Sequence, residues 1–353
     1  MNYTTLGTSG LKVSSLCFGA MGLGKSWNWG ADRETSFKLL ETFANAGGNF
    51  IDTANIYTDG ESEKIIGEFL KTERDNFVIA TKYTLADSRT GIKAAIEEGK
   101  GNVNGTGNNR KNMLRSLQQS LKRLKTDYID VFYLHIWDHM TPVEEVMRGL
   151  DDLVSRGLVH YIAISDTPAW VVSRAQMLAE LRGWAQFVAL QVEYSLLQRT
   201  PERELIPMAR ELGLTVTPWA PLAGGALTGK YLHGEKGRLP DNSRRLSPEA
   251  QTIIREVIKV AESYGVPPSQ VALRWTMQQD FKCIPIVGTT KVTQLEENLN
   301  ALHLTLDQKH IDLLNEVSSI ELGFPGSFFR EEGVKQSVYG GFFEKIEHPN
   351  LPE

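Results

Sequence analysis

The chain has 353 residues, of which 41% are hydrophobic and 23% are charged, as in ordinary globular proteins. Its formal net charge of −5 excludes the basic surface that nucleic-acid binding needs, so no nucleic-acid partner is expected. The two cysteines, Cys17 and Cys283, are too few for a disulfide framework. We expect a cytoplasmic protein without a membrane partner, because no stretch reads as a membrane span or a signal peptide.

Short apolar runs alternate with helical patterns along the chain. Eight units, each an expected strand followed by an expected helix, occur in this order: 15–19 and 33–46, 49–53 and 61–71, 77–82 and 111–124, 129–135 and 143–155, 159–165 and 169–181, 187–191 and 202–212, 215–219 and 247–264, 283–287 and 292–300. A further helix is expected over 269–279, in the seventh connection. Eight such units predict an α/β protein with a (β/α)₈ barrel, the TIM-barrel architecture.

Three helix starts carry the same sequence pattern. Thr141, Thr200 and Ser247 each precede a proline, and an acidic residue follows within two further positions. A hydroxyl side chain can accept a hydrogen bond from a free backbone amide, and proline suits the first helical turn. We therefore expect these residues to cap the helices that follow.

Other segments fall outside the repeat. Residues 6–11 read as a hairpin turn, which we expect across the bottom of the barrel. Residues 99–109 are rich in Gly and Asn and predict a mobile surface loop. We expect a single domain over 1–353, with the barrel at about 13–303 and a C-terminal helix and tail at about 305–353. The tail is rich in aromatic residues and is expected with the long loops at the catalytic face, where it covers the opening or packs on the barrel wall.

Ionisable side chains stand at the ends of three successive expected strands. Asp52, Lys82 and His135 end these strands, and Tyr57 follows Asp52 closely. The carboxyl ends of barrel strands meet at one face, so these four side chains are expected to surround one point. Taken singly, each has an ordinary explanation, such as a helix cap, a packed ring or a solvated charge. The functional interpretation depends on their joint placement.

The four side chains suit proton transfer to or from a carbonyl group. Tyrosine alone has a pKa of about 10, and a neighbouring ammonium such as Lys82 lowers that pKa. A buried lysine needs an anion to keep its proton, and Asp52 supplies one. His135 can orient a carbonyl oxygen or help to move a proton. The site would protonate a carbonyl as hydride arrives, or deprotonate an alcohol as hydride leaves.

The motifs around these residues resemble those of the aldo-keto reductase superfamily. Residues 48–63 are similar to its signature, and similar motifs follow in order at 81–82, 134–135, 191–194, 218–222 and 288–291. The resemblance implies a catalytic tetrad of Asp52, Tyr57, Lys82 and His135, with Tyr57 as general acid/base and no metal. Residues 165–170 look most like the branch with fungal aryl-alcohol dehydrogenases and norsolorinic-acid-reductase-like proteins.

The resemblance also implies that NADP(H) binds across the barrel opening. Ser165, Asp166 and Gln191 would hold the nicotinamide carboxamide, and most relatives have Asn in place of Asp166. Lys291 suits a 2′-phosphate, so NADP(H) is expected over NAD(H), although some relatives have Arg where Gln294 stands. The full expected set is Ala20, Met21, Asp52, Ser165, Asp166, Gln191, Trp219, Ala220, Pro221, Leu222, Gly224, Leu227, Lys230, Gly288, Thr289, Thr290, Lys291, Gln294, Glu297 and Asn298.

Several tryptophans follow the expected strands and predict an aromatic substrate pocket. The expected substrate contacts are Trp29, Tyr57, His135 and Trp137. They favour reduction of an aromatic or bulky aldehyde or ketone, or the reverse oxidation. The alternative is that two or three of the tryptophans only pack helices against the barrel.

Other functions fit parts of the sequence. Residues 224–231 nearly match a phosphate-binding P-loop, but Tyr231 stands where a Ser or Thr must reach Mg²⁺. No zinc site is expected at His135 and His139, because a third ligand is missing. Two alternatives stay open, namely a cofactor-binding regulatory subunit with little turnover and an oxidoreductase acting on sugar-derived ketones. The sequence does not determine the oligomeric state.

Overall fold

A computed structural model describes residues 1–71, 73–86, 97 and 102–346. Eight parallel strands form the central sheet, in the order β10-β3-β4-β5-β6-β7-β8-β9. The strands are β3 Cys17–Gly19, β4 Phe50–Asp52, β5 Val78–Tyr83, β6 Ile129–Leu134, β7 Val159–Ser165, β8 Phe187–Gln191, β9 Thr215–Val216 and β10 Ile286–Val287. The Ile284 amide donates to the Val216 carbonyl oxygen at 2.9 Å, and the Ile286 amide donates to that of Pro218 at 2.9 Å. These bonds join the two edges of the sheet and close the barrel.

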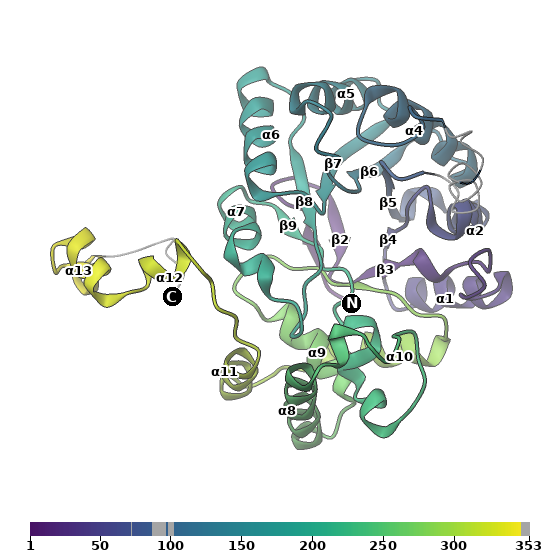
Figure 1. The fold of residues 1–353 in the computed structure, drawn as a ribbon. Helices are drawn as coiled ribbons and strands as arrows, with labels where there is room; N and C mark the ends of the chain where they lie inside the picture. The colour runs from purple at the N-terminus through teal and green to yellow at the C-terminus, as the bar shows by residue number, and fades with distance from the viewer. Residues whose placement is uncertain (72, 87–96, 98–101, 347–353) are drawn as a thin grey trace.

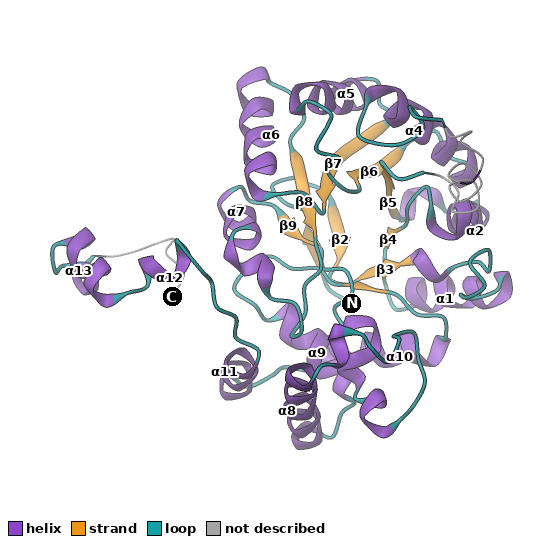
Figure 2. Ribbon diagram, in the orientation of Figure 1, coloured by secondary structure: helices purple, strands orange, loops and turns teal. Residues whose placement is uncertain are grey.

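Helices surround the strands, as Figures 1 and 2 show. The helices that follow barrel strands are α1 Arg33–Asn45, α2 Glu61–Phe69, α4 Arg110–Leu124, α5 Val143–Ser155, α6 Ala169–Arg182, α7 Leu205–Glu211, α8 Pro248–Tyr264 and α10 Val292–Leu299. The seventh connection also holds α9 Pro268–Met277, and α11 Gln308–Val317 packs on α8. The predicted (β/α)₈ order is confirmed. Among the described residues, no helix has the length and apolar character needed to cross a membrane.

One expected helix is divided, and two of the three expected caps do not form. The segment 202–212 splits into a 3₁₀ turn, η4 Thr200–Arg203, and α7. Ser247 does accept a backbone amide at 3.3 Å at the start of α8. In contrast, the Thr141 hydroxyl donates to Asp138 Oδ2 at 2.7 Å, and the Thr200 hydroxyl donates to Gln198 Oε1 at 2.6 Å. The cap positions are Pro142 for α5 and Arg199 for η4, so Thr141 precedes its cap and Thr200 already lies inside the turn, and neither hydroxyl caps a free amide.

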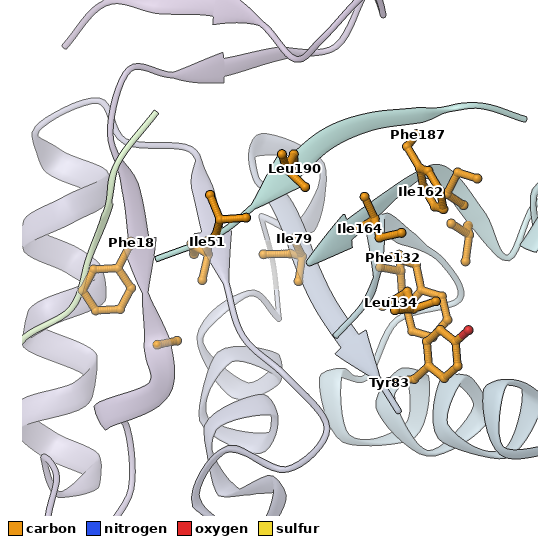
Figure 3. Close-up of a cluster of buried hydrophobic side chains, with 14 of the residues drawn as sticks. Phe18, Ile51, Ile79, Tyr83, Phe132, Leu134, Ile162, Ile164, Phe187 and Leu190 are labelled. Atoms are coloured by element: carbon orange, nitrogen blue, oxygen red, sulfur yellow. The ribbon is translucent and has the colours of Figure 1, made fainter. Parts of the chain in front are cut away.

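Strand side chains alternate between two apolar layers. The layer between strands and helices contains the residues that Figure 3 labels: Phe18, Ile51, Ile79, Tyr83, Phe132, Leu134, Ile162, Ile164, Phe187 and Leu190. The alternate layer fills the barrel and contains Phe50, Val78, Ala80, Val131, Tyr133, Ala163 and Ala189. Successive side chains of a strand point to opposite faces. The residues that continue the inner layer toward the carboxyl ends are Asp52, Lys82, His135, Ser165 and Gln191.

The N-terminal hairpin closes the opposite end of the barrel. Its antiparallel strands are β1 Tyr3–Thr5 and β2 Lys12–Ser14. Leu6 and Val13 are fully buried in the layer that fills the barrel. The Gly7 amide donates at 2.7 Å to the hydroxyl of Thr215, the first residue of β9. The hairpin therefore lies at the amino ends of the strands, as predicted.

The loop before α4 is anchored over the part that the structure describes. Residues 99–101 of the expected mobile loop lie outside the described residues. Asn108 is fully buried, and its amide group donates to Thr84 Oγ1 at 2.9 Å and to the Ile136 carbonyl oxygen at 3.0 Å. These bonds join Asn108 to the segments after β5 and β6, whereas residues 102–104 are exposed, and the mobility of the loop stays a prediction.

The C-terminal tail extends away from the barrel. It carries two short helices, α12 Gly326–Phe329 and α13 Glu332–Tyr339, and Figure 1 shows them projecting beyond α11. Phe324 is 86% exposed and Phe342 is 58% exposed. This corrects the expectation that the tail covers the opening or packs on the barrel wall, because its aromatic side chains contact one another within the tail instead.

Candidate active site

Three side chains form a hydrogen-bonded chain at the carboxyl ends of β4 and β5. Lys82 Nζ donates to Asp52 Oδ1 at 2.5 Å and to the Tyr57 hydroxyl oxygen at 3.2 Å. It also donates to the Thr53 carbonyl oxygen at 2.8 Å. An ammonium has three protons, so all of its donors are used. Lys82 is therefore held in one position, although it is completely buried.

A strained turn presents Tyr57 to this lysine. Tyr57 begins a 3₁₀ segment in which Thr58 and Asp59 have φ values of 46° and 55°. Such left-handed conformations cost energy in residues other than glycine and collect at functional sites. The Thr58 hydroxyl donates to the Leu23 carbonyl oxygen at 2.6 Å and accepts from the Ser62 amide at 3.0 Å. These bonds hold the turn, and the Tyr57 hydroxyl stays near the ammonium.

Electrostatics keep Lys82 charged and Tyr57 protonated. Burial favours a lower pKa for the Lys82 ammonium, but Asp52 and Tyr57 together outweigh it and raise the pKa. For Tyr57, burial raises the pKa, and the Lys82 charge offsets only part of that effect. The expectation that the lysine leaves Tyr57 with a lowered pKa is therefore wrong. The Lys82 ammonium is already paired with Asp52. Its stabilisation of the Tyr57 phenolate is therefore smaller than the cost of removing that phenolate from water.

The His135 ring lies edge-on against the Tyr57 ring. The two ring centroids lie 5.9 Å apart and the ring planes meet at 80°. Burial lowers the pKa of the His135 imidazole well below its usual 6.5, and the Lys82 charge lowers it further. The Nδ1 atom is buried and has no hydrogen-bond partner among the described residues. The imidazole is therefore neutral, and its Nδ1 is a buried polar atom that no described residue pairs with, which is unusual in a folded protein.

The residues expected at a nicotinamide ring lie at the same carboxyl end of the barrel, at or just after the ends of β7, β8 and β9. Ser165 is 1% exposed, and its hydroxyl lies near the Asp166 carboxylate without a hydrogen bond of ordinary geometry to the described part of the chain. Gln191 Nε2 donates to Asp52 Oδ2 at 2.9 Å, so this amide is joined to the Asp52–Lys82 pair. Trp219 Nε1 donates to Asp166 Oδ1 at 3.1 Å. Desolvation raises the pKa of the Asp166 carboxyl, while the Trp219 hydrogen bond works to lower it.

Backbone strain gathers at the same end of the barrel. Nine described residues other than glycine have a positive φ, and eight of them lie in loops that follow barrel strands. The loop after β9 contributes Ala220 and Ala223 and continues with Gly224 and Gly225 at 69° and 90°. Strained backbone of this kind points to a functional site. The eight residues are Asn28, Thr58, Asp59, Thr84, His139, Asp166, Ala220 and Ala223.

The loop between β10 and α10 is compact, and its lysine is exposed. The Thr289 hydroxyl donates to Gln294 Oε1 at 2.7 Å and accepts from the Lys291 amide at 3.1 Å. Glu297 accepts a hydrogen bond from Ser269 on α9, so one oxygen of its carboxylate is already engaged. The other expected cofactor contacts lie on α10 or in the loops after β3, β9 and β10: Ala20, Met21, Pro221, Leu222, Leu227, Lys230, Gly288, Thr290 and Asn298.

Trp27 is the tryptophan that lies against the candidate proton donor. Its ring centroid is 6.5 Å from that of Tyr57, in an edge-on arrangement. Trp29 lies 5.9 Å from Trp27 and carries the Arg238 guanidinium 4.6 Å from its ring centroid. Trp137 is 8% exposed and packs in the layer between strands and helices. The expected substrate contacts included Trp29 but not Trp27. Both lie in the same loop, and their spacing in the sequence does not show which of the two side chains points toward Tyr57.

Known proteins resemble this chain over nearly its whole length. Residues 15–319 match the model of the Aldo/keto reductase family. An aryl-alcohol dehydrogenase (NADP(+)) from Phanerodontia chrysosporium is 40% identical, with 95% of this chain and 91% of that protein covered. Norsolorinic acid reductase from Aspergillus flavus is 35% identical, with 92% and 82% covered. Aldo-keto reductase ausK from Emericella nidulans is 37% identical, with 90% and 81% covered. The chain therefore belongs to the aldo/keto reductase family.

Proposed function

We propose that the protein reduces an aldehyde or ketone to an alcohol with NADPH, or catalyses the reverse oxidation. The hydrogen-bonded chain from Asp52 through Lys82 to Tyr57 carries this proposal. In this chain the protonated Tyr57 hydroxyl lies beside the buried Lys82 ammonium, and the ammonium is paired with the Asp52 carboxylate. General acid catalysis of carbonyl reduction needs a proton donor whose anion is stabilised at the moment of transfer.

Each residue has a distinct role in this proposal. Tyr57 donates its hydroxyl proton to the carbonyl oxygen, and in the reverse direction its phenolate takes the proton from the alcohol. Lys82 stabilises the phenolate across 3.2 Å, and Asp52 keeps the lysine protonated. His135 is neutral and holds the carbonyl oxygen near the Tyr57 hydroxyl.

The residues around the opening fit a nicotinamide cofactor. The buried Ser165 hydroxyl makes no hydrogen bond of ordinary geometry to the described residues and suits the carboxamide. Trp219 can stack on the nicotinamide ring, and Asp166 fixes the orientation of its indole. Bound there, NADPH supplies the hydride. We favour NADP(H) over NAD(H) because Lys291 offers a cation to the 2′-phosphate and a relative at 40% identity is named for NADP(+).

We propose an aromatic or bulky carbonyl compound as substrate. The rings of Trp27 and Tyr57 lie edge-on at 6.5 Å, and aromatic substrates pack well on such surfaces. One of the relatives is named for aryl alcohols, which supports the same class. Trp137 is left out of this wall, because its ring is buried between strands and helices.

The proposal is tested by NADPH oxidation, followed as loss of absorbance, with aromatic aldehydes, aliphatic aldehydes, quinones and keto-sugars. We expect turnover with NADPH and a preference for aromatic carbonyls. Tyr57→Phe removes only the proton donor, so it should abolish turnover and leave NADPH affinity within about twofold of wild type. Tight NADPH binding by the wild type without turnover of any compound would contradict the proposal and favour a regulatory role.

A further inference from the structure

The C-terminal arm, residues 322–346, exposes a large apolar surface. Phe324, Phe329 and Phe342 are 86%, 60% and 58% exposed, and Val338 is 65% exposed. With Phe328, which is 44% exposed, and at about 200 Å² for a whole phenylalanine side chain, the exposed aromatic rings of the arm amount to roughly 500 Å² in total. This is a large apolar exposure for one short segment, and extensive apolar exposure marks interaction surfaces.

The arm is an organised element with a fixed base. Rings within it are in contact, with centroid distances of 5.9 Å for Phe324–Phe328 and 5.0 Å for Tyr339–Phe343. At its base, the Arg203 guanidinium donates to the Glu321 carbonyl oxygen at 2.8 Å. The match to the family ends at residue 319, so the arm lies outside the barrel that the family shares.

A second apolar surface lies on α6. Trp170, Met177 and Leu181 are 62%, 55% and 76% exposed. Their spacings of seven and four residues place them on one face of the helix. By the same measure, this face exposes roughly 400 Å² of apolar side chain. The helix packs on α5 and α7 through its other faces.

Both surfaces lie on the same side of the barrel. The base of the arm is bonded to η4, which contacts α7, and α7 contacts α6. Figure 1 shows the arm projecting on the side of α6 and α7 and leading away from its own barrel. An arm that projects away from its own barrel can bury its apolar side chains on a second copy of the chain, while the arm of that copy docks on the first. In a two-fold dimer the same contact then forms twice.

We propose that this chain forms a homodimer by arm exchange, in which residues 322–346 of one copy dock on the α6 face of the other. Burying both surfaces in two equivalent contacts would remove roughly 1,600–1,800 Å² from water, which is the size of a stable, specific interface. The arm carries three Lys or Arg and three Asp or Glu residues. This neutral balance lacks the basic residues with which amphipathic helices bind membrane surfaces, so a second copy of the chain is the favoured partner.

The mass of the full chain in solution, measured by light scattering after gel filtration, gives the first test. We expect a dimer, and Val338→Asp/Phe342→Asp in the arm or Met177→Asp/Leu181→Asp on α6 should each weaken it by at least about 100-fold. Val103→Asp is the matched control, because Val103 is 87% exposed and belongs to neither surface. A monomeric full chain at tens of micromolar, or a dimer that survives both double variants, would overturn the proposal.

A cross-link tests which copy the arm contacts. The variant Leu181→Cys/Val338→Cys places one thiol on α6 and one on the arm. The native Cys17 is buried, and Cys283, which is partly buried, is replaced by serine in the double variant and in both single variants. Under mild oxidation we expect covalent dimers on a non-reducing gel, and neither single variant should give them. Cross-linked monomers would show that the arm folds back on its own α6. That result, or no cross-link at all, would contradict exchange.

Discussion

Replacing Lys82 with methionine removes its charge and keeps most of its volume. Lys82 Nζ lies 3.2 Å from the Tyr57 hydroxyl oxygen in a fully buried position. At an effective dielectric constant of about 20, a unit charge at this distance stabilises a phenolate by at most about 5 kcal/mol. Only part of the phenolate charge has formed in the transition state. If between half and all of the interaction is lost, kcat for carbonyl reduction falls by about 10²–10⁴-fold.

The same substitution leaves Asp52 without its cation. Asp52 is 3% exposed and keeps a hydrogen bond from Gln191 at 2.9 Å. Breaking a buried ion pair by removing one partner typically lowers the free energy of unfolding by about 3–5 kcal/mol. The double variant Asp52→Asn/Lys82→Met also removes the unpaired negative charge. We expect it to regain most of the stability and none of the activity.

Three measurements on both variants separate these effects. Turnover is followed by NADPH absorbance with an aromatic aldehyde at about pH 7, NADPH affinity by tryptophan fluorescence, and stability by thermal unfolding. For Lys82→Met the NADPH affinity should change little, because Lys82 is not among the expected cofactor contacts; Asp52 is one of them, so the affinity of the double variant is judged separately. The reasoning is refuted if Lys82→Met keeps more than about a tenth of kcat. It is also refuted if activity returns with stability in the double variant, since Lys82 would then act only on folding.

Three further outcomes distinguish the roles of other residues. Burial raises the pKa of Tyr57 above its ordinary 10.0, so its acid form persists at neutral pH. The kcat for reduction should therefore stay level from about pH 6 to about pH 9, and the rate of alcohol oxidation should rise with pH. A reduction rate that already halves between about pH 7 and about pH 8 would contradict that assignment. Lys291→Ala should raise the KM for NADPH at least about tenfold, since a charge-assisted hydrogen bond contributes about 1.5–3 kcal/mol. The KM for NADH should stay unchanged, and equal effects on both cofactors would exclude a 2′-phosphate contact. Trp27→Ala should lower kcat/KM for aromatic relative to aliphatic aldehydes by about tenfold. Trp137→Ala should lower Tm without changing that ratio, and matching ratios in the two variants would remove Trp27 from the substrate wall.

Local patterns in the sequence determined the barrel and the gathering of Asp52, Lys82 and His135. Buried parallel strands read as continuous apolar runs, and their alternation assigns each side chain to the inside or the outside of the barrel. Polar residues that continue the inner set must point into the open end. The positions of the strand ends, and the ionisable residues found there, were therefore predictable. Strand periodicity depends only on residues that are close in the chain.

Long-range contacts decided what local patterns could not. Thr141 and Thr200 have the sequence of helix caps, but the two helical segments begin one residue away from the expected positions, with Pro142 and Arg199 as their caps. The sequence indicated a charged lysine beside Tyr57, yet the sign of the tyrosine pKa shift depends on how deeply the fold buries both groups. A competition between desolvation and Coulomb attraction is settled only by depth and distance.

The direction of side chains and segments beyond the strands also required the tertiary structure. Trp27 and Trp29 share one loop, and only the assembled opening shows that Trp27 lies against Tyr57. The aromatic composition of the tail indicated burial, but composition cannot name the surface that buries it. The structure directs the arm away from its own barrel. The hydrophobic effect is non-directional, so the sequence determines only that the tail is rich in apolar side chains. The fold determines on which side of the molecule these side chains are exposed.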